Sequence, residues 1–128
     1  MAIRTELSLR LPNSPGALAQ VCSALGDERV RVLALHLEST GILRLIVDNP
    51  VRATGTLRER RHEVVEKEVA VVVLSNAPGS LASVLSLVRD AGVNIEYAYG
   101  ATSSESASTA LVVLGVDDPM RAGAAAGI

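Results

Sequence analysis

An internal repeat, each copy of which takes up about half of the chain, is the feature that most constrains the fold. Residues 13–19 read NSPGALA, and residues 76–82 read NAPGSLA. When both stretches are extended to eighteen positions, nine of the aligned pairs are identical. Two copies are too few for a solenoid array. The repeat therefore predicts one small domain present twice, with modules at 1–66 and 67–128.

The spacing between the two copies grows further along the chain. The sequence DNP at 48–50 matches DDP at 117–119, six residues beyond the spacing of the first match. The added residues fall in the Ser-rich stretch 102–108, which is typical of a longer hairpin loop. The second copy also stops early, because Ile128 aligns with Glu59 of the first.

The apolar pattern changes period in the same order in both modules. In the first, Leu7 and Leu9 belong to an alternating strand, and Leu18, Val21 and Leu25 recur at helical spacing. We expect strands at 3–11, 30–37, 42–47 and 64–65 with helices from Pro15 and Pro50, then strands at 69–74, 93–100 and 108–116 with helices from Pro78 and Pro119. This β-α-β-β-α-β order is the ferredoxin-like plan.

No residues remain to form a closing strand in the second module. Its tail, residues 122–128, is rich in Ala and Gly, and glycine weakens a helix by roughly 1 kcal/mol relative to alanine. We therefore expect a short last helix. We also expect an uncovered sheet edge in the second module, which invites pairing with another chain.

The repeated loop, Asn-x-Pro-Gly-x-Leu-Ala, is the candidate site. Asn13 or Ser14 is expected to cap a helix whose first turn holds Pro15. Free N–H groups at a helix start bind small anions such as a carboxylate, and a glycine allows close approach. Asparagine both donates and accepts hydrogen bonds, so the loop suits an α-amino acid. The alternative interpretation is that each loop is a helix start and nothing more.

This pattern closely resembles the ACT domain, a small regulatory module of amino-acid metabolism, present as a tandem pair. The two loops carry the resemblance, together with GILRLIVDNP at 41–50 and GVNIEYAYG at 92–100. The resemblance implies an α+β protein with two ferredoxin-like modules side by side in one antiparallel sheet of the eight-stranded type. The helices would cover one face, and the second copy would lack its last strand.

The resemblance also implies which residues bind the amino acid. They lie in the loop after the first strand of each module and are Asn13, Ser14, Pro15, Gly16, Ala17 and Leu18 in the first copy and Asn76, Ala77, Pro78, Gly79, Ser80 and Leu81 in the second. Ala77 replaces Ser14, which removes a hydroxyl from the second loop. If one loop alone is competent, we expect it to be the loop at Asn13.

Composition excludes several other classes of protein. The net charge of −2 argues against nucleic acid as a partner, because such binding depends on clustered cations. With one cysteine, Cys22, and two histidines without ligand spacing, we expect no metal site. No apolar run approaches the roughly 20 residues that span a bilayer, so we expect a cytoplasmic protein without a membrane partner.

The sequence therefore predicts a non-catalytic sensor of a free amino acid, with that effector in place of any cofactor. No nucleophile–base pair or phosphate-binding motif predicts an enzyme. The resemblance implies a homodimer and a regulated metabolic enzyme, such as an acyl-CoA ligase. One alternative is a structural subunit without a ligand, assembling through a sheet edge or its helices. Another is a small enzyme on the same fold, such as an acylphosphatase-like or a dimeric isomerase-like protein. The acylphosphatase-like version would need an arginine in the loop where this chain has residues 12–17, PNSPGA.

Overall fold

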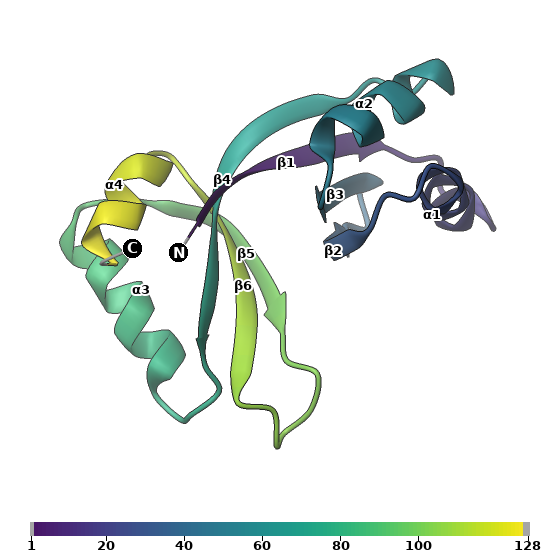
Figure 1. Ribbon diagram of the computed structural model, residues 1–128. Helices are drawn as coiled ribbons and strands as arrows, with labels where there is room; N and C mark the ends of the chain where they lie inside the picture. Colours follow the sequence, from purple (N-terminus) through teal and green to yellow (C-terminus); the bar gives the residue numbers. More distant parts are fainter. Residues whose placement is uncertain (1, 127–128) are drawn as a thin grey trace. The chain divides into compact units, whose positions relative to one another are not determined.

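A computed structural model describes residues 2–126, which fall into two compact units (Figure 1). The N unit consists of residues 5–67. The C unit consists of residues 68–126 together with residues 2–4 from the start of the chain. Two long strands run through both units, because β1 begins in the C unit and β4 begins in the N unit.

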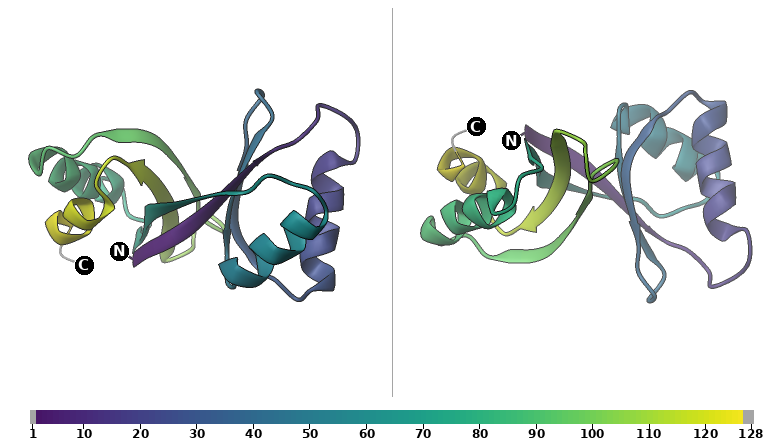
Figure 2. Two further views of the ribbon diagram at one scale, coloured as in Figure 1. Left: turned by 90° about the horizontal axis from the view of Figure 1, so that it is seen from above. Right: turned by 90° about the horizontal axis from the view of Figure 1, so that it is seen from below.

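The N unit has the ferredoxin-like order of elements. These are β1 (Ala2–Arg10), α1 (Ala17–Asp27), β2 (Val32–Leu37), β3 (Ile42–Val47), α2 (Pro50–Glu59) and the beginning of β4 (Val65–Ser75). The strands lie in the order β2-β3-β1-β4, and β3 pairs antiparallel with both β2 and β1. Both helices cover the same face of these strands (Figure 2).

The core of the N unit follows from the alternation in its strands. Leu7 and Leu9 of β1 point to the face that the helices cover, where they meet Leu43 and Leu45 of β3. The apolar side of α1, including Leu25, closes this layer. Burying each such side chain stabilises the fold by roughly 1.5–3 kcal/mol.

The C unit repeats the plan. It contains β4, α3 (Ser80–Asp90), β5 (Ile95–Ala101), β6 (Thr109–Val116) and α4 (Pro119–Ala125), and its strands lie in the order β1-β4-β6-β5. The core packs Ala70 and Val72 of β4 against Leu114 of β6 and Val88 of α3. The α+β class and the ferredoxin-like order of both copies are thus confirmed.

The expected closing strand at 64–65 and the expected strand at 69–74 are one continuous strand, β4. The charged stretch 66–68 separates these two expected strands in the sequence. It lies within β4, because exposed charged side chains are compatible with an extended backbone. The described residues therefore contain six strands.

The expectation of an uncovered edge in the second module is wrong. In the C unit, β4 has β6 on one side and the first residues of β1 on the other. In the N unit, β4 is the neighbour of β1 and lies on the far side of β1 from β3. In the C unit, the start of β1 takes the equivalent place beside β4. The expected short last helix is present as α4, which has seven residues.

Candidate functional site

The Pro-Gly pair of each loop forms a tight turn before the helix. The N–H of Ala17 donates to the carbonyl of Ser14 at 3.3 Å, and Gly16 has φ +85° and ψ −7°. These are the features of a type II turn, which favours proline at its second position and needs glycine at its third. In the second loop, the N–H of Ser80 donates to the carbonyl of Ala77 at 3.2 Å, and Gly79 has φ +86°.

This turn overturns the predicted helix starts. The helices begin at Ala17 and Ser80, after the Pro-Gly pairs, and their N-caps are Gly16 and Gly79. Neither Asn13 nor Ser14 caps α1, since no side chain forms a capping hydrogen bond there. Because Gly16 is the N-cap of α1, the side chain of Asn13 is not used to cap the helix.

A cavity of about 510 Å³ lies beside the first loop. Its lining combines the loop and the start of α1 with Leu37 and the turn between β2 and β3. Of the predicted residues, Asn13, Ser14, Gly16, Ala17 and Leu18 line this cavity, whereas Pro15 does not.

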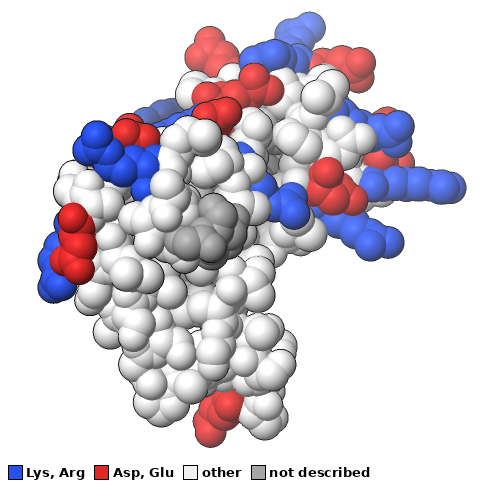
Figure 3. All heavy atoms as spheres, turned by 60° about the vertical axis from the view of Figure 1, so that its left-hand side comes forward, with Lys and Arg blue, Asp and Glu red and all other residues white. Residues whose placement is uncertain are grey.

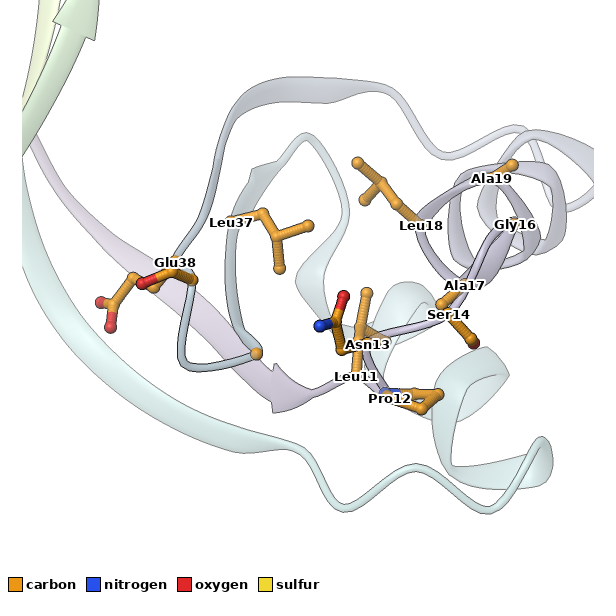
Figure 4. A pocket seen from close by; sticks show the side chains of 12 residues that line it. Leu11, Pro12, Asn13, Ser14, Gly16, Ala17, Leu18, Ala19, Leu37 and Glu38 are labelled. Atoms are coloured by element: carbon orange, nitrogen blue, oxygen red, sulfur yellow. The ribbon is translucent and has the colours of Figure 1, made fainter.

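The side chains around the cavity differ in direction (Figure 4). Leu18 and Leu37 extend toward its centre from α1 and β2, as does Leu11, which directly follows β1, and the amide of Asn13 lies among them. Leu11 and Leu37 were not predicted as site residues from the sequence. The alternation of leucines along residues 33–37 was a signal for Leu37, but no motif connected that strand to the loop.

The cavity has unused hydrogen-bonding capacity on one side. Within residues 2–126, the side chain of Asn13 forms no hydrogen bond. The first N–H groups of a helix have no partner inside the helix, and no side chain caps those of α1. Leu18 and Ala19, at the second and third helical positions, both line the cavity. An amide and two N–H groups can therefore meet one carboxylate.

Glu38 lines the same cavity, yet its carboxylate points away from the centre (Figure 4). It accepts hydrogen bonds from the hydroxyl of Thr40 and from Nε of Arg44, both at 3.1 Å. The hydrogen bond from Thr40, followed by that from Arg44, lowers the pKa of Glu38 below its ordinary value of 4.5. Arg44 also pairs with the buried Glu6 at 3.4 Å. Glu38 is thus engaged in a local ion-pair network.

The second loop uses its asparagine differently. Nδ2 of Asn76 lies 3.1 Å from the carbonyl of Ala107, 3.3 Å from that of Glu105 and 3.4 Å from that of Ser104. The backbone N–H of Asn76 donates to the carbonyl of Ser108 at 3.0 Å. The amide therefore fastens the long loop between β5 and β6 to the end of β4.

The C unit has its own groove, of about 380 Å³, between α3 and β5. Asn76 and Leu81 line it, whereas the other predicted residues of the second loop (Ala77, Pro78, Gly79 and Ser80) do not. The groove is thus displaced from the helix start toward the sheet.

The remaining candidate residues add no further centre. In the described chain no three His, Cys, Asp or Glu side chains, those of His36 and His62 included, are grouped to hold a metal ion. Cys22 is half-buried and unpaired. Between residues 2 and 126, no helix is long and apolar enough to cross a membrane.

The family model that describes an ACT domain pair matches residues 1–124. The chain belongs to this family. The resemblance drawn from the two Asn-x-Pro-Gly loops is confirmed, and the ferredoxin-like units are ACT domains. No curated protein matches the sequence of this ACT pair.

Solved structures share the fold of the ACT pair. Protein BT0572 from Bacteroides thetaiotaomicron is 30% identical, with a TM-score of 0.87 over 96% of this chain and 85% of that one. The ligand-free regulatory subunit of aspartate kinase from Thermus thermophilus is 21% identical, with a TM-score of 0.73 over 99% and 96% of the two chains. The corresponding subunit from Thermus flavus is 22% identical, with a TM-score of 0.68 over 98% and 94%.

Proposed function

We propose that this ACT pair is a non-catalytic regulatory protein that binds a free amino acid in the cavity beside Asn13. The observation that carries the proposal is the difference between two equivalent asparagines. The amide of Asn13 is unused and lies in a cavity, whereas the amide of Asn76 is occupied by loop carbonyls. The proposal therefore assigns ligand binding to the first loop and a structural role to the second.

The chemistry of the cavity suits the backbone of an amino acid. The N–H groups of Leu18 and Ala19 lie at the positive end of the α1 dipole, where a carboxylate is favoured. The side-chain oxygen of Asn13 can accept a hydrogen bond from an ammonium group. The leucines at 11, 18 and 37 then face the side chain of the ligand.

The regulated partner is proposed to be a metabolic enzyme. Two structures that share this fold are regulatory subunits of aspartate kinase, which supports an enzyme as the kind of partner. That the enzyme is an acyl-CoA ligase, and that the chain forms a homodimer, stay predictions. A ligand in the cavity would act by linkage, since binding to one arrangement of the protein stabilises that arrangement over others.

A thermal-shift screen against the twenty amino acids tests the proposal, with calorimetry on each hit. At one hundred times its dissociation constant, a ligand stabilises the folded state by about 2.7 kcal/mol. We expect Asn13→Ala to weaken binding and the matched variant Asn76→Ala to leave it unchanged. Absence of a shift with every amino acid at millimolar concentration would contradict the proposal and favour the structural subunit without a ligand.

A further inference from the structure

The N unit has a second cavity, apart from the one beside Asn13. It has a volume of about 530 Å³ and lies at the end of β1, next to the first residues of β3 and β4. Ser8 and Arg10 of β1 line it, together with Arg61, His62 and Glu63 from the turn after α2. The two cavities share no lining residue, so this one needs an explanation of its own.

Positive charge is concentrated in the N unit. Nine of the twelve Lys and Arg residues of the chain lie within residues 5–67, against eight of the fourteen Asp and Glu residues. In the C unit, residues 69–88 contain no charged residue, and Figure 3, which brings the α3 side forward, shows a large area without charged side chains. An anionic ligand therefore finds its cationic partners in the N unit, where two arginines line one cavity.

The backbone of the turn after α2 holds Arg61 in place. The N–H of His62 donates to the carbonyl of Leu57 at 3.1 Å, and the N–H of Arg61 donates to that of Arg58 at 2.9 Å. These two hydrogen bonds form a Schellman motif, and they satisfy carbonyls at the end of α2 within the turn. The motif favours glycine at the position of Arg61, which has φ +67°. An arginine thus stands where glycine would fit without strain.

The same motif ends α1 and α3, which allows a comparison. After α3 the left-handed residue is Gly92, with φ +73°, and after α1 it is Arg29, with φ +58°. The C unit thus has the glycine that the motif favours, whereas the N unit has an arginine in both places. Arg29 does not line the cavity, so it is a matched control for Arg61.

The cavity offers hydrogen-bond donors that the described residues leave unused. Nη1 of Arg10 donates to the carbonyl of Thr40 at 2.8 Å, which holds the guanidinium at the turn between β2 and β3. A guanidinium has five N–H donors, so Arg10 keeps others for a ligand. Among residues 2–126, the side chains of Ser8, Arg61 and His62 form no hydrogen bond or ion pair. Two arginines, an imidazole and a hydroxyl are therefore available to one anionic group.

The remaining lining residues indicate what accompanies that group. The carboxylate of Glu63 has no partner among the described residues, and it can accept hydrogen bonds from hydroxyl groups. It also repels a second negative charge. Ile42 and Val65, the latter 62% exposed, add apolar surface that suits a short carbon skeleton. The combination fits a ligand with one anionic group and several hydroxyls.

We propose that this cavity binds the phosphoryl group of a small phosphate monoester that carries free hydroxyl groups. Arg10 and Arg61 pair with the phosphate oxygens, because a guanidinium matches phosphate geometry with two parallel N–H groups. The donors come from two separate segments, and a phosphoryl group has three terminal oxygens to meet them, whereas a carboxylate has two. The proposal does not depend on amino-acid binding, since the two cavities have no residue in common.

A two-dimensional amide NMR titration at constant ionic strength tests the proposal, with glycerol 3-phosphate, inorganic phosphate and malate as probes. We expect the signals of residues 8–10 and 61–63 to move with both phosphate probes, more tightly with glycerol 3-phosphate. The signals of residues 16–19, beside the other cavity, should stay in place. Malate, with two carboxylates, should bind at least tenfold more weakly than glycerol 3-phosphate, roughly the effect of one charge-assisted hydrogen bond.

Two glycine variants locate the site. Arg61→Gly should weaken the binding of glycerol 3-phosphate by about tenfold or more, since charge-assisted hydrogen bonds are lost. Its Tm should be unchanged or raised, because glycine adopts the left-handed backbone without strain. Arg29→Gly makes the same change at the equivalent backbone position outside the cavity and should leave binding unchanged. Glu63→Gln should strengthen the binding of inorganic phosphate by about twofold or more, because it removes a like charge.

Several results would overturn the proposal. Signals of residues 8–10 and 61–63 that stay still with both phosphate probes would show that the cavity binds no phosphoryl group. Malate binding as tight as that of glycerol 3-phosphate would contradict the choice of a phosphoryl group. Equal weakening by Arg61→Gly and Arg29→Gly would indicate a diffuse effect of net charge. If Arg61→Gly does not fold, Arg61→Gln and Arg29→Gln replace the pair with the same expected contrast. None of these outcomes affects the titration with amino acids.

Discussion

Replacing Asn76 with alanine removes a side-chain amide that ties the end of β4 to the loop between β5 and β6. The amide has two protons, and its nitrogen lies 3.1, 3.3 and 3.4 Å from three loop carbonyls. One contact has good hydrogen-bond length, and the two longer contacts share the second proton.

The expected cost follows from this geometry. A typical intramolecular hydrogen bond contributes about 1 kcal/mol net, and shared bonds contribute less each, so the loss is about 1–2 kcal/mol. The glutamate and serine carbonyls of the loop are exposed and regain water, which keeps the cost from rising further. For a protein of this size the loss corresponds to roughly 3–8 °C in Tm.

Thermal unfolding followed by circular dichroism measures this effect, with Asn13→Ala as the matched control. The same substitution in the equivalent loop removes no hydrogen bond among residues 2–126, so it should change stability by less than about 0.5 kcal/mol. Asn76→Asp should cost more than alanine, because it places a carboxylate opposite carbonyl oxygens. Equal Tm shifts for the two alanine variants would refute the assignment of unlike roles to the two asparagines.

Four further substitutions probe the turns, the caps and the ion-pair network. Gly79→Ala places a Cβ in open space but at φ +86°, so it should destabilise the fold by about 1–2 kcal/mol. Gly26→Ala lies inside α1 and should stabilise the fold by up to about 1 kcal/mol. Urea denaturation measures both changes, and equal urea midpoints for the two variants would contradict this prediction. Asn49→Ala removes the side-chain oxygen that accepts a hydrogen bond from the N–H of Arg52 at 3.1 Å and so caps α2. We expect the free energy of unfolding to fall by about 1 kcal/mol in the same assay. An unchanged urea midpoint would show that this cap does not stabilise the fold. Because the pKa of Glu38 is lowered in the folded state, its contribution is present above the ordinary value of 4.5 and is lost as pH falls through the folded pKa. The stability difference between the unaltered chain and Glu38→Gln should therefore shrink as denaturation is measured from neutral pH to pH values below 4.5, and a constant difference would count against the network.

Local sequence signals predicted most of the fold. The alternation around Leu7 and Leu9, the helical spacing of Leu18 and Leu25, and the repeat itself placed the elements of both units correctly to within a few residues. The starts of α2 and α4 at Pro50 and Pro119 were predicted correctly. The starts of α1 and α3 were misplaced, because Pro15 and Pro78 are compatible with both a first helical turn and a type II turn. The hydrogen bond from Ala17 to Ser14 is what selects the turn.

Features that depend on distant parts of the chain were not predictable in this way. Nothing in residues 2–4 indicates that they complete the C unit, since the strand reads as part of the first module. The two asparagines have nearly identical neighbours in sequence, yet their roles differ. The difference arises from the extra residues at 102–108, which bring carbonyl groups to Asn76 and have no equivalent near Asn13.

The most direct test of the central claim is a two-dimensional amide NMR titration with an amino acid that shifts the Tm. The account predicts that the amide signals of Gly16, Leu18 and Ala19 move on binding, because their loop holds the ligand. The matching signals of the second loop, from Gly79, Leu81 and Ala82, should stay in place. Movement in both loops, or in the second alone, would contradict the assignment of ligand binding to the loop at Asn13.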